Sequence, residues 1–232
     1  MRNERVLLEV IATTVDDAIA AERGGADRLE LVTAMGEGGL TPSIGMIEAV
    51  VAAVSIPVNV IVRPHSRSFV YSVDDFAVML RDVRGAKNAG ANAVVIGMLT
   101  ASRRVDRDGL QRVVDAADGM PITFHRAFDE AADLLEALEV LLEFDAVTNV
   151  LTSGGKPSVL DAAVEIRALM ARAVGSHCTV LAGAGFTVER VRDFVCATRV
   201  EAVHFGSGVR VGGAGLAPVS EQKVREVRGL LD

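Results

Sequence analysis

Eight short apolar runs recur along the chain, and each is followed by a longer stretch with helical periodicity. The runs lie at residues 6–11, 28–32, 58–63, 93–98, 122–126, 147–152, 179–183 and 202–206. Nearly continuous apolar runs of this length are typical of parallel strands covered by helices. Eight strand–helix units in 232 residues come close to the ~250 residues of a (β/α)8 barrel. The pattern therefore predicts an α/β fold, a TIM barrel with a closed, parallel, eight-stranded sheet. An open doubly wound sheet is the alternative.

The segments between the apolar runs carry the signals that begin and end helices. Thr14 with Asp17 predicts a capping box. Pro42 is expected at the first position of the next helix, and Ser72 is expected to cap the helix after that. No linker or low-complexity segment divides the sequence, so we expect residues 1–232 to form a single TIM-barrel domain.

Polar side chains gather at the carboxyl ends of the predicted strands, which form the functional face of a TIM barrel. Glu9 in "LLEV" and Glu30 in "RLELV" occupy equivalent places and are expected to be neighbours in the barrel mouth, because a buried, unpaired carboxylate under the helices would be costly. The stretch "PITFHRAFDE" brings three more ionisable groups to the end of one strand. The candidate catalytic residues are Glu9, Glu30, His125, Arg126, Asp129 and His204.

Two interpretations of this polar ring are open. In the structural one, carboxylates and arginines form a salt-bridge network that closes the top of the barrel. In the functional one, the carboxylates and histidines act as general acids and bases on a polar substrate, because crowding separates the pKa values of like charges. The same groups suit a borderline divalent metal, although no HExxH-type spacing supports one. The metal-ligand candidates are Glu9, Glu30, His125 and His204.

Three glycine-rich segments, "LTSGG", "LAGAG" and "HFGSG", follow the last three predicted strands. In TIM barrels the loops after strands seven and eight recurrently bind phosphate through backbone N–H groups. Tight turning is the alternative role for these glycines. The candidate substrate- or anion-binding residues are Arg63, Thr152, Ser153, Gly183, Gly185, Gly206 and Gly208. The loop over residues 36–43, "GEGGLTPS", is either a lid or a turn.

A formal net charge of −7 argues against nucleic acid or an anionic membrane as a partner. No apolar run reaches membrane-spanning length and no signal-peptide core precedes the first strand, so we expect a cytoplasmic protein. The two cysteines are too few for a disulfide framework. We expect Cys178 and Cys196 to lie toward the opposite end of the barrel and to be buried, inert packing residues.

Taken together, the motifs "LLEV", "GADRLEL", "EGGLTPS", "TFHRAFD", "LTSGG" and "AGAG" make the chain resemble the CutC family. The resemblance extends over nearly the whole chain, and "EGGLTPS" and "TFHRAFD" are its most specific parts. It implies a TIM barrel, a cytoplasmic location, a homo-oligomer (dimer or tetramer), and copper homeostasis as the assigned role. Some relatives carry cysteines directly after the first strand, where this chain has "LEVIATT", and "RPHSRSF" replaces the relatives' glycine pair.

The sequence leaves functions of different classes open. The first is copper binding or handling, which follows from the resemblance alone, so the cofactor is copper, another divalent metal or none. The second is an enzyme, a lyase, isomerase or hydrolase, that acts on a small polar or phosphorylated sugar-like substrate at the carboxyl face of the barrel. A non-catalytic binding scaffold is the third. The shared Glu, His, Arg and Gly motifs suit the enzyme better than a carrier of a thiophilic ion.

Overall fold

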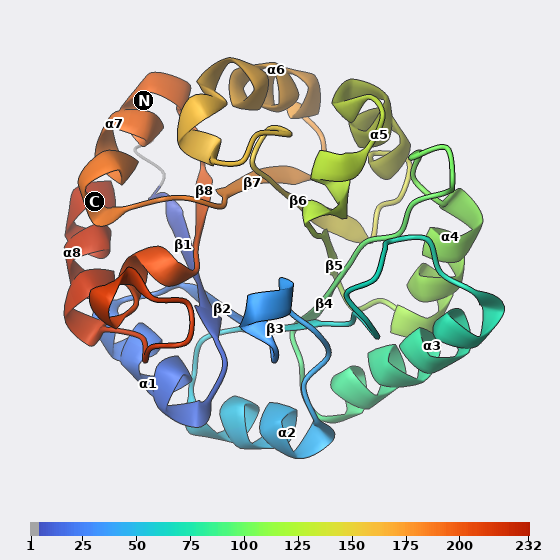
Figure 1. Ribbon diagram of the computed structural model, residues 1–232, viewed down its shortest axis with the longest axis horizontal. Helices are drawn as coiled ribbons and strands as arrows, with labels where there is room; N and C mark the ends of the chain where they lie inside the picture. The colour runs from blue at the N-terminus through green and yellow to red at the C-terminus, as the bar shows by residue number, and fades with distance from the viewer. Residues whose placement is uncertain (1–4) are drawn as a thin grey trace.

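The computed structural model describes residues 5–232, which form a closed parallel barrel of eight strands (Figure 1). The strands are β1 Leu7–Ala12, β2 Arg28–Leu31, β3 Val58–Ile61, β4 Ala93–Ile96, β5 Ile122–Phe124, β6 Val147–Thr152, β7 Thr179–Gly183 and β8 Ala202–Phe205. Each strand pairs with its neighbours in chain order, and β8 pairs with β1 to close the sheet. The predicted TIM-barrel fold is confirmed, and the open sheet is excluded.

Within the described residues, eight α-helices surround the barrel, as Figure 1 shows in the view onto its end. They are α1 Val15–Gly24, α2 Ile44–Ala53, α3 Val73–Asn88, α4 Arg107–Ala117, α5 Leu134–Leu141, α6 Ala163–Ala173, α7 Val188–Thr198 and α8 Glu221–Leu231. Short 3-10 helices stand in the strand exits: η1 Met35–Glu37, η2 Arg126–Glu130, η3 Val159–Asp161, η4 Ser207–Val209 and η5 Val211–Gly213. None of the helices in residues 5–232 has the length and apolarity needed to cross a membrane.

Two of the predicted helix starts are wrong in detail. Thr14 accepts the N–H of Asp17, but the Asp17 carboxylate accepts the N–H of Thr13 at 3.0 Å rather than that of Thr14, so the predicted capping box is only half formed. Pro42 precedes α2, which Ser43 caps, rather than occupying its first position. Ser72 caps α3 as predicted. The Asp17 carboxylate also lies 3.1 Å from the buried guanidinium of Arg210 and accepts the N–H of Val219 at 2.8 Å, so it joins the start of α1 to the segment after β8.

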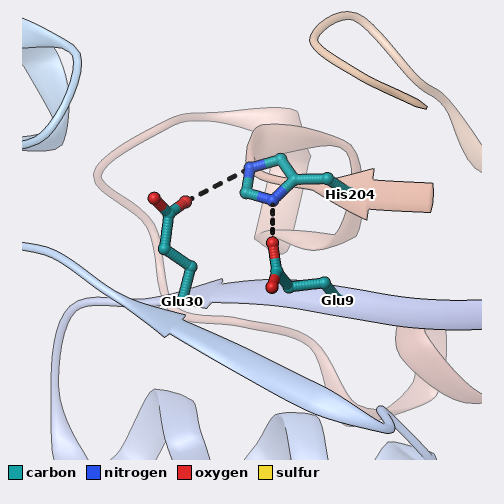
Figure 2. A group of neighbouring side chains, drawn as sticks. All are labelled: Glu9, Glu30 and His204. Atoms are coloured by element: carbon teal, nitrogen blue, oxygen red, sulfur yellow. Dashed lines mark hydrogen bonds and ion pairs between the residues drawn. The ribbon is translucent and has the colours of Figure 1, made fainter. Parts of the chain in front are cut away.

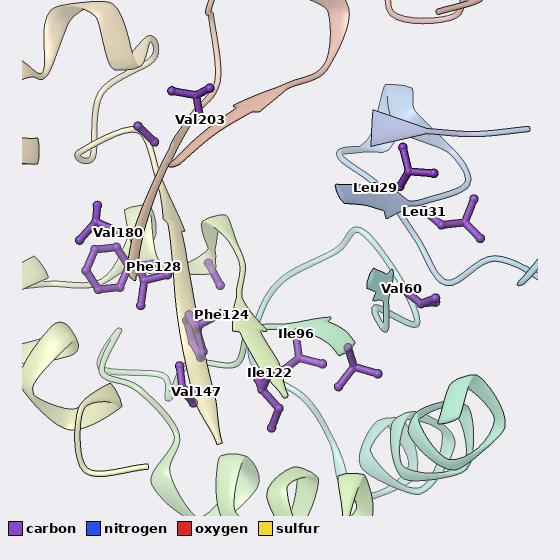
Figure 3. Close-up of a cluster of buried hydrophobic side chains, with 14 of the residues drawn as sticks. Leu29, Leu31, Val60, Ile96, Ile122, Phe124, Phe128, Val147, Val180 and Val203 are labelled. Carbon is purple, nitrogen blue, oxygen red and sulfur yellow. The ribbon is translucent and has the colours of Figure 1, made fainter. Parts of the chain in front are cut away.

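The main core lies between the outward face of the strands and the surrounding helices. Figure 3 shows part of it: Leu29, Leu31, Val60, Ile96, Ile122, Phe124, Phe128, Val147, Val180 and Val203. These side chains are at most 5% exposed, and full burial of each contributes about 1.5–3 kcal/mol. This layer fixes the outward face of every strand, and so it also fixes which residues point inward.

The inside of the barrel is not uniformly apolar. Val32, Ile61 and Val95 form one small buried cluster, and Leu151, Leu181 and Ala202 form another. Other inward positions carry charged or polar side chains that are also buried, among them Glu9, Glu30, Asn59 and His204. Buried charges are costly unless they are paired. The pairing of these groups therefore decides the chemistry at the barrel mouth.

Candidate active site

Strand register places the Glu9 carboxylate between two basic side chains. The Cα atom of Glu9 is level with Arg28 on β2 and with His204 on β8. Glu9 accepts a bond from Arg28 Nε at 2.5 Å, and its other oxygen lies 2.8 Å from His204 Nδ1. Because Glu30 is two residues beyond Arg28 along β2, it stands level with Ile11, nearer the mouth.

The His204 imidazole joins the two glutamates, as Figure 2 shows. Its Nδ1 faces Glu9, and its Nε2 lies 3.5 Å from the nearer Glu30 oxygen. All three side chains are at most 6% exposed. Glu9 and Glu30 are therefore close together, as predicted, but the His204 imidazole lies between the two carboxylates.

The two carboxyl groups have different surroundings and different pKa values. Burial by itself would raise the pKa of Glu9, but Arg28 and His204 outweigh it and lower the pKa to about 2. Burial raises the pKa of Glu30 to about 7, and the charge of Glu9 adds to this against the opposing effect of His204. Burial disfavours the His204 cation, yet the bond to Glu9 and the charge of Glu30 raise its pKa. Glu9 is thus a fixed anion, whereas Glu30 changes charge near neutral pH.

A pocket of about 380 Å³ opens above this cluster at the carboxyl ends of the strands. The predicted site residues that line it are Glu30, Arg63, His125, Arg126, Asp129, Gly185, His204 and Gly206. The predicted residues outside the lining are Glu9, Thr152, Ser153, Gly183 and Gly208. Residues of η1 and its loop, including Met35 and Glu37, also form the wall, and Figure 1 shows η1 over the barrel opening.

His125 and Arg63 stand at the pocket wall with most of their surface buried, at 5% and 7% exposed. The first ring nitrogen of His125, Nδ1, accepts the N–H of Ala127 at 3.1 Å. Burial and the nearby Arg63 charge lower the pKa of His125 to about 3, so the ring is neutral. Arg63 donates to the carbonyls of Glu37 and Gly39 at 2.9 and 3.1 Å. These bonds tie the loop that the sequence offered as a lid or a turn to the pocket wall.

Asp129 organises the exit of β6. Its carboxylate accepts bonds from Thr152 Oγ1 at 2.5 Å, from the Ser153 and Gly155 N–H groups at 3.1 Å, and from Arg126 Nε at 2.8 Å. Arg126 also donates to Ser153 Oγ at 3.1 Å. Both carboxylate oxygens of Asp129 are occupied by these bonds, so Asp129 holds the loop after β6 in place. Thr152 and Ser153 contact Asp129 but do not line the pocket themselves.

The predicted glycines divide into two groups. A Cβ atom on Gly183 would lie 2.6 Å from Leu151 Cδ1 and 3.0 Å from His204 Cβ, and one on Gly208 would lie 2.2 Å from the carbonyl oxygen of Phe186. Both glycines therefore leave room for close packing. Gly185 and Gly206 lie in the pocket wall, and they are closely packed as well, since a Cβ on Gly185 would lie 2.4 Å from Ser158 Oγ and one on Gly206 3.0 Å from Met35 Cε.

Three residues of the site, Arg28, Phe69 and Gly97, were not among those predicted from the sequence. Arg28 pairs with Glu9, and its position two residues before Glu30 was a usable signal. Gly97 follows β4, and a Cβ there would lie 2.4 Å from His125 Nδ1, so only glycine leaves room for the ring. The Phe69 ring lies 5.1 Å from the His125 ring and 4.9 Å from the Arg63 guanidinium carbon. A loop aromatic of this kind leaves no periodic signal in the sequence.

The prediction for the cysteines is correct for one and wrong for the other. Cys178 is buried before β7, and burial raises the pKa of its thiol to about 12. Cys196 is exposed, so its predicted burial is wrong. The buried face of α7 is formed by Val191 and Phe194, and position 196 lies on the outer side of the helix.

The donor chemistry of the cluster tests whether copper fits. Atoms of Glu9, Glu30 and His204 that can bind a metal lie within 4.8 Å of one another. Oxygen and imidazole nitrogen do not suit Cu(I), which selects thiolate and thioether ligands. They suit a borderline divalent ion such as Cu(II), which Glu30 and His204 Nε2 would hold while Glu9 orients the ring through Nδ1.

The fold and cluster define a TIM-barrel protein with a buried carboxylate–histidine group at the carboxyl ends of its strands. The CutC family model matches residues 6–209, and the chain belongs to the CutC family. Family protein CutC of Salmonella enteritidis is 39% identical over 203 residues, which cover 88% of this chain and 80% of that protein. Its counterpart in Photobacterium profundum is 36% identical over 199 residues, covering 86% and 80%.

Solved structures agree with this assignment. A CutC protein of Streptococcus agalactiae, provisionally named for copper homeostasis, superposes with a TM-score of 0.81 at 27% identity, covering 86% of this chain and 97% of that one. Phosphoribosylanthranilate isomerase of Thermotoga maritima superposes with a TM-score of 0.64 at 14% identity, covering 97% and 98%. The second likeness shows the barrel fold alone.

Proposed function

We propose that the protein is an enzyme that transforms a small, polar, anionic molecule at the barrel mouth by proton transfer, with Glu30 as the group that takes and returns the proton. The observation that carries this proposal is the placement of Glu30, a buried carboxyl group that lines the pocket while its nearest charged partner, His204 Nε2, stays 3.5 Å away. Near neutral pH, both forms of such a group are populated, which is what a general acid–base requires.

The surroundings of Glu30 support this role. Glu9 and Arg28 hold the His204 ring from below, so His204 keeps one orientation toward Glu30 and can exchange a proton with it. Arg63 and Arg126 add positive charge to the pocket wall and favour an anionic ligand. Each cation has a partner elsewhere, and neither forms an ion pair with Glu30 among residues 5–232.

The proposal is tested by incubating the protein in D2O with a library of small phosphorylated and carboxylated sugars and hydroxy acids, with proton NMR as the readout. We expect at least one compound to exchange a carbon-bound proton or to be converted by the parent and not by Glu30→Gln. Glu48→Gln, on the exposed side of α2, is the matched control and should behave as the parent does. If no compound changes, or if Glu30→Gln is as active as the parent, the proposal is wrong.

Copper handling is the second candidate, with the ion as cargo. It is favoured by the name of the Streptococcus agalactiae relative and by the cluster of Glu9, Glu30 and His204. Titration of untagged protein with Cu(II) and with Cu(I) tests it. Tight Cu(II) binding that is lost in His204→Ala would support it, and the absence of saturable binding of either ion would contradict it.

We also propose a cytoplasmic location, which the sequence pattern and the family resemblance both favour, and assembly as a dimer or tetramer, which comes from the resemblance alone. Cell fractionation and light scattering after size-exclusion chromatography test them.

A further inference from the structure

Two buried hydrogen-bond donors in the pocket wall lack partners. Neither Nε of Arg63 nor Nε2 of His125 bonds to any group in the described chain, and both atoms are shielded from solvent. Because His125 Nδ1 accepts the Ala127 N–H, the neutral ring carries its proton on Nε2. Unmet buried donors are rare in native proteins, and each calls for a physical explanation.

The Arg63 and His125 side chains meet at the Phe69 ring. The Phe69 ring packs against both, at 5.1 Å from the His125 ring and 4.9 Å from the Arg63 guanidinium carbon, and it lines the same pocket. Gly97 leaves space for the His125 ring, and the carbonyls of Glu37 and Gly39 fix the far end of Arg63. Both side chains are therefore held in place, with their unpaired donors shielded beside the Phe69 ring.

We propose that the Phe69 ring turns aside to admit a small, anionic α-hydroxy carbonyl compound, whose carbonyl oxygen the two donors bind. The reaction is proton transfer at the carbon next to that carbonyl. This inference rests on the proposed function, because Glu30 supplies the base. The C–H bond at that carbon breaks and its proton goes to a Glu30 oxygen. The electron pair forms a carbon–carbon double bond, and the carbonyl oxygen becomes an enolate oxygen bonded by His125 and Arg63.

The reverse step returns the proton to either carbon of the enediolate and gives the substrate or its isomer. Electrons and atoms balance without an oxidant or reductant. A neutral imidazole donor suits this step, because it bonds the developing oxyanion without holding it as a fixed ion pair. The pocket volume of about 380 Å³ is at the small end of ligand pockets, which suits a compound of a few carbons.

The test has a binding part and an exchange part. Glycolohydroxamate, a planar mimic of the enediolate, is titrated into full-length protein labelled with ¹⁵N-histidine. We expect saturable binding that shifts the His125 Nε2–H signal. Binding should be lost in His125→Ala and retained in His125→Gln, which keeps an N–H donor at the tip of the side chain. His177→Ala, at the opposite end of the barrel, is the control.

In the exchange part, deuterium uptake at the α-carbons of dihydroxyacetone phosphate and glycolaldehyde phosphate is followed in D2O. We expect His125→Ala to slow uptake about 100-fold, the usual effect of removing one oxyanion donor, with partial rescue by His125→Gln. Exchange that persists in His125→Ala, or a hydroxamate that leaves the His125 signal unmoved, overturns this inference and leaves the proposed function standing. Hydroxamate binding without Glu30-dependent exchange of these phosphates or of any compound in the library overturns the proposed function, and failure of both parts overturns both.

Discussion

Replacing Glu30 by Gln should stabilise the protein at alkaline pH and change it far less at acidic pH. In the folded chain, burial raises the pKa of Glu30 from 4.5 to about 7. Below pH 4.5, Glu30 is protonated in both the folded and the unfolded state, so its ionisation does not affect the free energy of unfolding. As the pH rises between the two values, the unfolded chain releases the proton first, so the free energy of unfolding falls. Above the higher value the destabilisation is complete.

The magnitude follows from the two pKa values. A rise from 4.5 to about 7 corresponds to about 3 kcal/mol of lost stability at alkaline pH. Glutamine carries no ionisable group and is close in volume, so Glu30→Gln removes this loss. We expect the free energy of unfolding of the variant, relative to the parent, to increase by up to about 3 kcal/mol between about pH 5 and about pH 8.

Urea unfolding followed by circular dichroism measures the effect, with linear extrapolation at each pH. Comparing the two pH values separates the ionisation of Glu30 from the pH-independent change in its contacts with His204. Glu48→Gln removes the same charge from an exposed position on α2 and should show no comparable pH dependence. If Glu30→Gln is no more stabilising at about pH 8 than at about pH 5, Glu30 is not held protonated by burial and the reasoning is refuted.

Three further predictions concern Gly97, Asp129 and the two cysteines. Gly97→Ala should displace the His125 ring, because the new Cβ would lie 2.4 Å from Nδ1. We expect the free energy of unfolding to fall by about 1–3 kcal/mol in thermal or urea unfolding and the His125 NMR signal to shift, and an unmoved signal would contradict this. Asp129→Ala removes the acceptor of at least four hydrogen bonds and should lower the unfolding free energy by about 2–3 kcal/mol; a neutral effect would show that water replaces it. The double variant Cys178→Ala, Cys196→Ala should keep any copper affinity that the parent shows in a titration. The Cys178 thiol is buried and protonated, and the Cys196 thiol stands alone on a helix surface. A loss of affinity would place the metal chemistry at the other end of the barrel.

Much of the site's location was readable from the sequence. Strand periodicity puts Glu9 and Glu30 on inward positions, and the parallel barrel brings the ends of all eight strands to one face. These are local properties: the alternation of side chains along a strand and the order of strands along the chain. They also explain why Arg63, His125 and His204 lie around the same pocket.

The tertiary structure decided which of these groups pair. Glu9 and Glu30 occupy similar places in their own strands, yet strand register sets Glu9 level with Arg28 and His204, and Glu30 nearer the mouth. That register depends on how the closed sheet is staggered, which no single strand specifies. One carboxylate is consequently a fixed anion below the pocket, and the other is a titrating group in its wall.

Long-range contacts likewise decided the roles of residues that the sequence treated alike. Asp129 belongs to the same motif as His125, but bonds to the exit of β6 make it an anchor of that loop. The His125 ring keeps its place in the pocket wall because Gly97, from another strand exit, leaves room for it. The sequence specifies the residue types, but their partners belong to segments that meet only when the barrel closes. The pKa of a buried charge and the bonds of a buried donor depend on those partners.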